Sequence, residues 1–384
     1  MSFVVDPVYL STVLLLLVAL AEWLARKRGF RLLGSALIVI LAAAVLANLR
    51  LIPSSTDAPP LYDGIFTYLA PLAIFFLLLD VRLRDLRRAG LPMLILFGVG
   101  AATTVLGVIV GYHLIAPENR GVERAFAVGG MFAGTYTGGS VNLNAVALQY
   151  GVAKNGTLFA AINAADNIIT TLWIVATLLL PRLLERWFPR RALPPVPVPV
   201  PLESAVNPEA SERIGVIDLA LLLALGTGSL FLAQLVSRLL PVVPFILVLT
   251  TFALALAQLP VVQRLQGART LGYFSVLLFL AVIGAYCDVP ALLAHGSVAV
   301  TLLVWGTVIV LIHGAILFVG AGLLKQDWAM VAVASNANIG GATSAGVLAT
   351  ALGRDDLRLP GILVGSVGNA IGTYAGILVA ELLR

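Results

Sequence analysis

The chemistry of this chain is concentrated in two polar, glycine-rich stretches that interrupt otherwise apolar sequence. Residues 134–144 read GTYTGGSVNLN, and residues 336–344 read NANIGGATS. Hydrocarbon penalises unpaired polar groups, so such stretches are expected where protein buries them or where they line a cavity. Free N–H groups at a helix start attract anions, and amide, hydroxyl and carbonyl oxygens suit a hard cation such as sodium. We therefore predict solute binding by Thr135, Thr137, Gly138, Gly139, Ser140, Asn142, Gly340, Gly341, Thr343 and Ser344.

Asp166 is the second chemical signal, because it is a carboxylate within the apolar segment 157–181. It lies about nine residues into that segment, close to mid-bilayer at ~1.5 Å per residue. An intramembrane carboxylate is costly and is by default a candidate for ion or proton coupling. The alternative is a buried acid that makes only structural hydrogen bonds to neighbouring Asn and Thr side chains. We predict that the coupling cation uses Asp166, Asn167, Asn336, Asn338, Asn369 and Thr373, with sodium itself expected at Asp166, Asn167 and Asn369.

The two polar stretches are copies of each other, 202 positions apart in the chain. At this spacing Gly138 and Gly139 correspond to Gly340 and Gly341. Asp166 has no acidic counterpart, since a glycine occupies the equivalent position 368. Small residues could instead serve only close helix packing, as in Gly-x-x-x-Gly contacts. The duplication and the density of amides favour a binding site, in which one half supplies charge and the other only neutral polar groups.

The composition places these residues in a membrane. The 384 residues are 60% hydrophobic and only 11% charged, whereas a soluble domain is about a quarter charged. The single cysteine excludes an internal disulfide or a cysteine metal cluster, and the solitary His113 and His313 are expected to be structural. No phosphate-binding glycine loop and no serine or cysteine nucleophile motif is present. We therefore expect no enzyme activity and no cofactor beyond a coupling ion, and we attribute the net charge of +5 to membrane topology rather than to nucleic-acid binding.

The elements that must position the polar stretches are apolar segments long enough to cross a bilayer, which takes roughly 20 residues. The fold expected is an all-α polytopic membrane protein with ten transmembrane helices in two inverted five-helix repeats. Each repeat, 1–188 and 214–384, carries one re-entrant or broken glycine-rich element, and a proline-rich cytoplasmic linker, 189–213, joins them. The expected spans are 8–25, 32–49, 65–81, 91–115, 157–181, 214–236, 241–259, 271–287, 296–324 and 360–383.

Lys and Arg placement decides whether the glycine-rich elements cross the membrane or turn back. If both turn back, 18 of the 24 Lys and Arg residues lie on one side, whereas complete crossing gives 12 on each side. Cytoplasmic loops carry the excess of Lys and Arg, so the re-entrant arrangement is favoured. It predicts an integral plasma (inner) membrane protein with both termini extracytoplasmic.

Three stretches carry a family resemblance: 134–142, Ala165-Asp-Asn167 and 336–341. They resemble the membrane family described as domain of unknown function 819. More broadly, the layout resembles sodium/glutamate and sodium/citrate symporters, which have five-span inverted halves. That resemblance implies a homodimer whose scaffold is the first two spans of each half, and a mobile domain that moves as an elevator.

The combined expectation is a secondary active transporter, a symporter of a small organic solute coupled to sodium or protons. Solute and cation would bind together where the two polar stretches meet the Asp166 helix. The alternative is a sodium/proton antiporter in which Asp166 is the exchange site. The partners expected are therefore a small-molecule solute, the lipid bilayer and a second copy of the chain, with no nucleic acid.

Overall fold

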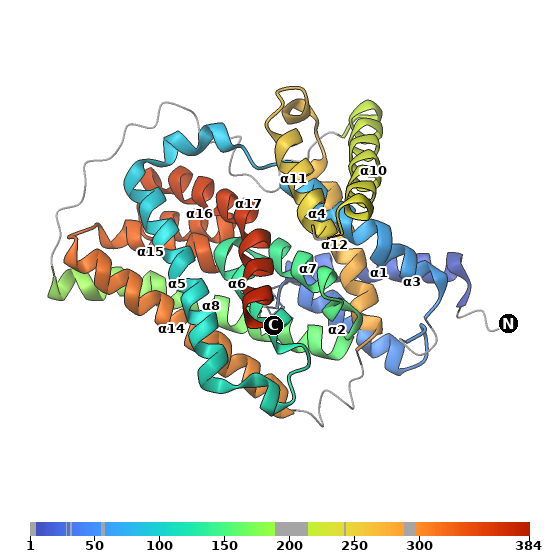
Figure 1. Ribbon diagram of the computed structural model, residues 1–384, viewed down its shortest axis with the longest axis horizontal. Coiled ribbons are helices and arrows are strands. Elements are labelled where there is room, and N and C mark those ends of the chain that lie inside the picture. Colours follow the sequence, from blue (N-terminus) through green and yellow to red (C-terminus); the bar gives the residue numbers. More distant parts are fainter. Residues whose placement is uncertain are drawn as a thin grey trace.

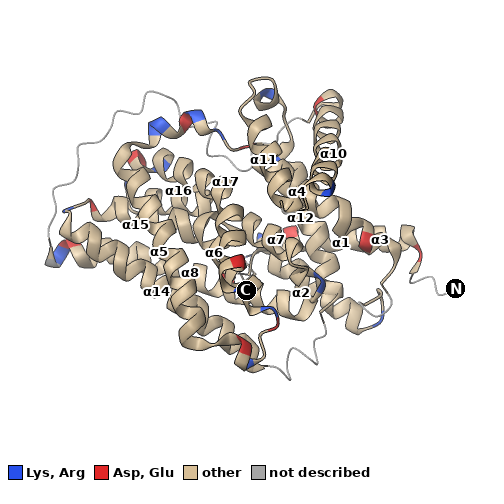
Figure 2. Ribbon diagram, in the orientation of Figure 1, with Lys and Arg blue, Asp and Glu red and all other residues tan. Residues whose placement is uncertain are grey.

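The computed structural model describes residues 5–27, 29–30, 33–54, 58–188, 214–241, 243–287 and 296–384. Within these ranges the regular secondary structure is helical, which confirms the all-α prediction. The predicted linker 189–213 lies outside the described residues. The described charged residues gather mainly at helix ends and connecting segments, with few in the interior (Figure 2).

Eight helices in the described part of the chain are long and apolar enough to span a membrane. This confirms a multi-pass membrane protein but not the count of ten spans. The second predicted span of each half corresponds to a shorter apolar helix, α2 (Gly34–Asn48) and α11 (Phe245–Ala257). The eight are α1 (Pro7–Ala25), the continuous run of α3 (Pro60–Gly64), a π-helical turn and α4 (Ala70–Leu78), α5 (Leu91–Ile115), α8 (Gly156–Trp187), α10 (Val216–Leu239), α12 (Ala268–Ala285), α14 (Gly296–Leu323) and α17 (Arg358–Leu383).

Local sequence fixes where several of these helices begin. The Asp6 carboxylate accepts hydrogen bonds from the backbone N–H groups of Val8 and Tyr9, and Pro7 occupies the first turn of α1. The Asn155 side chain accepts from the N–H of Leu158 at the start of α8. Short polar side chains satisfy the N–H groups that a helix start leaves free, which sets the first residue of the helix.

The helices form two groups. The six-helix group contains α1, α2, α4, α10, α11 and α12, which lie to the right in Figure 1. Its centre is close packing of α12 on α2 and α4, with edge-on contact between the rings of Phe66 and Phe279. The third predicted span of each half therefore packs with the first two. The scaffold implied by the resemblance, which had only two spans from each half, omits α4 and α12.

The hairpin group contains the remaining long helices α5, α8, α14 and α17 together with two helix pairs built from the glycine-rich stretches (Figure 1). The first pair is α6 (Ala125–Gly138) and α7 (Ser140–Gln149), and the second is α15 (Trp328–Ile339) and α16 (Gly341–Ala351). The breaks occur at Gly139, with φ 112°, and at Gly341, with φ 77°. This region of backbone space is open to glycine and strained for other residues.

Both pairs turn back on themselves. A Cβ atom on Gly130 of α6 would lie 3.3 Å from Cγ1 of Val146 in α7, whereas these residues would be about 24 Å apart along a straight helix. In the second pair, the Asn336 amide nitrogen lies 3.4 Å from the carbonyl oxygen of Ser344. We call α6–α7 the first hairpin and α15–α16 the second hairpin.

The two hairpins open at opposite ends of α17. Near its C-terminal end, Glu381 accepts a hydrogen bond of 2.7 Å from Tyr150, which follows the first hairpin. At its N-terminal end, the side chains of Arg358 and Ile362 face Gly346 of the second hairpin. The hairpins therefore enter the helix group from opposite directions and meet inside it.

Candidate functional site

The candidate site lies where the turns of the two hairpins touch. A Cβ atom on Gly139 would lie 4.0 Å from the Cα of Gly341, and one on Gly341 would lie 3.7 Å from the Cα of Gly139. The side-chain oxygen of Asn369, on α17, is 3.5 Å from the Cβ position of Gly139. The structure thus brings predicted residues from both halves of the chain to one place.

A glycine seam joins α6 to α17 beside this junction. Gly130, Gly134 and Gly138 of α6 each approach a glycine of α17, respectively Gly376, Gly372 and Gly368. A Cβ atom on Gly138 would lie only 1.9 Å from the carbonyl carbon of Gly368. Close helix packing, the alternative to a binding role for the small residues, therefore accounts for this part of the motif.

Asp166, on α8, lies beside the last turn of α6, which leads to the junction. It is 8% exposed, and its carboxylate lies near the hydroxyl groups of Tyr136 and Thr135 at the end of α6, without hydrogen-bond geometry to that of Tyr136. Among the described residues, its Oδ1 atom is buried without a hydrogen-bond partner, as is the Tyr136 hydroxyl oxygen. No basic side chain of the described residues interacts electrostatically with this carboxylate. An acid buried in this way fits a cation that binds there or a proton that it takes up.

Asn142 and Thr373 hold the first hairpin against α17. The Thr373 hydroxyl donates to the Asn142 side-chain oxygen at 2.8 Å, and the Asn142 amide nitrogen lies 3.4 Å from the Gly368 carbonyl oxygen. Both residues were predicted to bind ligand, one the solute and the other the cation. In the structure their polar side-chain atoms form hydrogen bonds with each other and with the backbone of α17.

The second hairpin has two buried side-chain oxygens without a partner among the described residues, as the first has at Tyr136 and Asn144. Asn338 donates through its amide nitrogen to the carbonyl oxygens of Phe97 and Ala334, at 3.1 and 3.2 Å, and its side-chain oxygen has no partner. The Asn336 side-chain oxygen is also buried without a partner. Ser344 donates to the carbonyl oxygen of Gly341 at 3.0 Å.

The other predicted residues lie at the edges of the site. The Thr137 hydroxyl donates to the carbonyl oxygen of Ala133 within its own helix. The Asn167 amide likewise donates to Asn163 in α8 and is half-buried. Ser140 and Thr343, which begin α7 and lie in the first turn of α16, are exposed, and Gly340 is half-buried at the second turn.

A buried network around His313 lies outside the set of site residues that the sequence predicts. His313 Nδ1 lies 2.9 Å from the Gly100 carbonyl oxygen, so this nitrogen must carry the donated proton. Nε2 of the neutral ring therefore accepts from the Ser335 hydroxyl at 2.8 Å, and the oxygen of that hydroxyl accepts from the ring N–H of Trp173 at 3.0 Å. The network ties α5, α14, α15 and α8 together. The available signal was that His313 is ionisable and lies inside an apolar helix.

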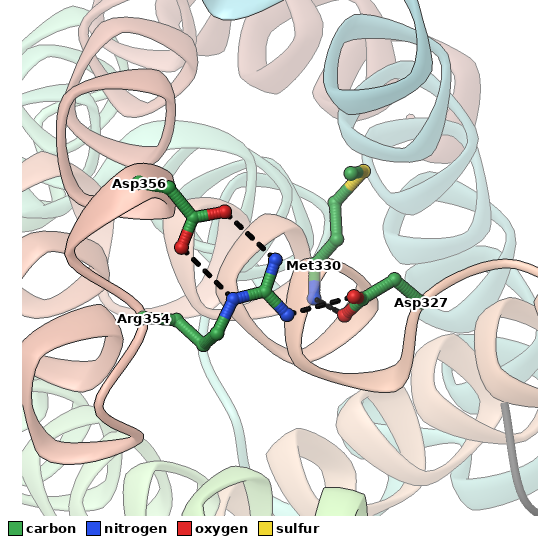
Figure 3. A network of polar contacts seen from close by, with 4 residues as sticks. All are labelled: Asp327, Met330, Arg354 and Asp356. Carbon is green, nitrogen blue, oxygen red and sulfur yellow. Dashed lines mark hydrogen bonds and ion pairs between the residues drawn. The ribbon is translucent and has the colours of Figure 1, made fainter. Parts of the chain in front are cut away.

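At the end of each hairpin that is opposite its turn, an arginine links the two helices or the segments next to them. Figure 3 shows Arg354, after α16, bound to both oxygens of Asp356 at 2.9 and 2.8 Å and to Asp327 at 2.7 Å. Asp327 also caps α15 by accepting from the N–H of Met330. Hydrogen bonds to Asp356 and then Asp327 raise the pKa of Arg354. At the first hairpin, Arg124 donates to the carbonyl oxygen of Tyr150.

Comparison with known proteins adds a family but no activity. The sequence model of a family described as "Protein of unknown function (DUF819)" matches residues 12–384. The chain is also similar to the "Uncharacterized membrane protein YjcL" of Bacillus subtilis (strain 168). The two sequences are 27% identical over 361 residues, which cover 89% of this chain and 88% of the relative.

Proposed function

The chain belongs to the family described as protein of unknown function DUF819, and on that premise we propose that it is a secondary active transporter. It carries a small organic solute, anionic or zwitterionic, together with sodium or protons. One observation carries the proposal: two hairpins that enter from opposite directions touch at Gly139 and Gly341, and the buried carboxylate of Asp166 lies beside the last turn of α6, which leads to this contact. Broken helices that meet from opposite sides are typical of the binding sites of secondary transporters.

Contacts across the halves support an inverted repeat with halves 1–188 and 214–384. Residues 202 positions apart meet each other at two separate places. One is the contact between Gly139 and Gly341, and the other is between Gly107 of α5 and Ile309 of α14. An element can contact its own counterpart in this way where a two-fold pseudo-axis passes between them. We propose ten spans in this arrangement, with α2 and α11 among them. We also propose that both termini lie outside the plasma membrane, because this orientation puts the excess of Lys and Arg on the cytoplasmic side.

The helix ends at the junction supply opposite partial charges. The C-terminal end of α6 carries partial negative charge, which together with Asp166 favours a cation. The N-terminal ends of α7 and α16 carry partial positive charge and free N–H groups, which favour a solute carboxylate. Neither 134–144 nor 336–344 contains a basic residue, so the N–H groups, Ser140 and Thr343 would recognise the solute.

The proposed transport cycle requires that the negative charge of Asp166 be neutralised before the site moves through the membrane. With its cation bound, the Asp166 carboxylate is neutralised and the loaded site can pass between the two aqueous sides. We propose that the hairpin group makes this movement against the six-helix group, as an elevator, and that the six-helix group forms a homodimer interface. The protein is then a carrier that changes no bond in its solute, rather than an enzyme.

A sodium/proton antiporter is the second candidate. It is favoured by the absence of a partner for Asp166 Oδ1, which leaves this atom available to a proton or to sodium in turn. The two candidates differ in whether an organic solute is required for ion movement.

Reconstituted protein separates them. A thermal-shift screen of metabolites, with and without sodium, selects a solute for uptake into proteoliposomes. Asp166→Asn is expected to abolish ion-stimulated uptake, while Asp218→Asn, at the first turn of α10, keeps it. Sodium addition that dissipates a pH gradient without any solute would establish the antiporter instead. Unchanged uptake by Asp166→Asn would remove Asp166 from both mechanisms.

A further inference from the structure

The turn of the second hairpin contains a buried oxygen without a donor. Asn336 is 0% exposed, and its side-chain oxygen has no hydrogen-bond partner in the part of the chain that the structure describes. Its amide nitrogen is turned toward the carbonyl oxygen of Ser344, at 3.4 Å. Because only the nitrogen can donate to a carbonyl group, the side-chain oxygen must face the other way, into the turn.

A second oxygen converges on the same point. A Cβ atom on Gly340 would lie 2.3 Å from the Ser344 hydroxyl oxygen and 2.8 Å from the Asn336 side-chain oxygen. The space beside Gly340 is therefore bordered by two oxygens and would be filled by a methyl group. The last carbonyl groups of α15 also end here and carry the partial negative charge of the helix. That of Asn336 accepts from the N–H of Gly340 at 2.8 Å and keeps a second lone pair for a ligand.

The first hairpin does not repeat this arrangement. The positions 202 residues earlier than Asn336, Gly340 and Ser344 are Gly134, Gly138 and Asn142. The first two are glycines in the seam with α17, and the polar atoms of the third bind Thr373 and Gly368. Asn144 of the first hairpin also has a buried oxygen without a partner in the described structure, but at a different position in the hairpin. The arrangement beside Gly340 is thus a property of the second hairpin and not a requirement of the hairpin fold.

The oxygens around Gly340 are all uncharged, and this restricts the kinds of ligand that can bind there. An amide or hydroxyl oxygen does not take up a proton in the physiological range, so the ligand is not a proton. Divalent cations in proteins are held chiefly by carboxylates, and no cluster of three His, Cys, Asp or Glu side chains suited to a metal occurs in the described residues. Neutral oxygens at the negative end of a helix fit a hard monovalent cation.

We propose that the turn of the second hairpin binds one sodium ion, separately from Asp166, through the side-chain oxygens of Asn336 and Ser344 and the terminal carbonyl groups of α15. The role of this ion rests on the proposed function, in which sodium is a coupling ion. The binding itself is independent of any solute. The Gly341 turn of this hairpin also touches the first hairpin, so an ion here would hold the junction in one conformation.

The test is sodium-dependent thermal unfolding of the purified full-length protein in detergent, without solute, with choline chloride keeping the ionic strength constant. Sodium is expected to raise Tm, and potassium to raise it less. Ser344→Ala is expected to require roughly tenfold more sodium for the same shift, as removal of a group from a metal site typically does. Thr350→Ala is the matched control, because its hydroxyl bonds the Gly346 carbonyl oxygen within the same helix, away from the turn.

Two further variants test the proposed sodium site independently of Ser344→Ala. Gly340→Ala fills the space without removing an oxygen and should also weaken the sodium response, even if Ser344→Ala proves too unstable to measure. Asp166→Asn should retain a sodium response. A Tm that sodium and choline raise equally, or a response lost in Asp166→Asn and kept in Ser344→Ala, overturns the proposal. Failure of the transport proposal looks different: sodium would still bind, but no solute would be taken up.

Discussion

Gly138 and Gly368 pack backbone against backbone, so that a Cβ atom on Gly138 would lie 1.9 Å from the carbonyl carbon of Gly368. Gly368 occupies the place that Asp166 holds in the first half of the chain. One copy of this position therefore seals the first hairpin against α17, while the other presents a carboxylate to the end of α6. The same position in the 202-residue spacing is thus a packing surface in one half and a charged site in the other.

Gly368→Ala should destabilise the protein by about 3 kcal/mol, since a methyl group would overlap the Thr137 carbonyl oxygen and the Cα of Gly138. The measurement is the shift in Tm in detergent. Gly98→Ala in α5 is the matched control, because nothing lies within 4 Å of a Cβ atom there. A methyl group at that position should stabilise the helix by roughly 0.5–1 kcal/mol. Equal effects at both positions would contradict the seam.

Asp166→Asn should leave the thermal stability undiminished while coupled uptake falls to background. The substitution keeps the size of the side chain and removes a charge that has no basic partner in the described structure, so the folded state gives up no ion pair. Tm and proteoliposome uptake are measured on the same preparation. A large loss of stability would indicate that Asp166 is mainly structural, which is the alternative interpretation of this residue.

Arg354→Gln should loosen the open end of the second hairpin. It leaves Asp327, which is 5% exposed at its side chain, without its cation, and breaking such a pair from one side costs about 3 kcal/mol. Hydrogen exchange should speed up in α16 and the first turn of α15. Arg88→Gln is the control: that residue is paired with Asp85 at 3.5 Å and is 62% exposed, so its loss should cost less than about 1 kcal/mol.

His313→Leu should cost about 1–3 kcal/mol, because it removes the acceptor of the Ser335 hydroxyl proton and one of the two side-chain donors to the Gly100 carbonyl oxygen. The loss is measured as a shift in Tm. His113→Leu provides the comparison, since that side chain lies in α5 but is exposed and should change stability by no more than about 0.5 kcal/mol. Similar values for the two histidines would mean that the network contributes little.

The orientation of the chain can be tested at the linker. A cysteine at Ser204, with Cys287→Ser as background, should be protected from a membrane-impermeant thiol reagent in intact cells and labelled after permeabilisation. Cys287 is buried, so its replacement mainly removes background reactivity. Labelling in intact cells would place segment 189–213 outside and contradict the orientation derived from Lys and Arg.

The sequence was most informative where the reason for a structure is local. Apolar runs interrupted at Gly139 and Gly341 predicted helices that break at these positions, because a positive φ there is open to glycine and strained for other residues. The distribution of Lys and Arg favoured elements that turn back, and the structure has hairpins at both positions. Asp166 stood out as an acid in an apolar segment, and it is buried with an unpaired oxygen.

By itself, then, the sequence determined the class of protein, the position of its breaks and the residue that carries buried charge, since all three follow from hydrocarbon's intolerance of free polar groups. Only the tertiary structure decided which polar atoms remain free. Asn142 and Asn336 look alike in sequence, yet Thr373 of α17 satisfies the first and nothing in the described structure satisfies the oxygen of the second. That difference depends on contacts across more than half the chain, and such contacts leave no local pattern to read.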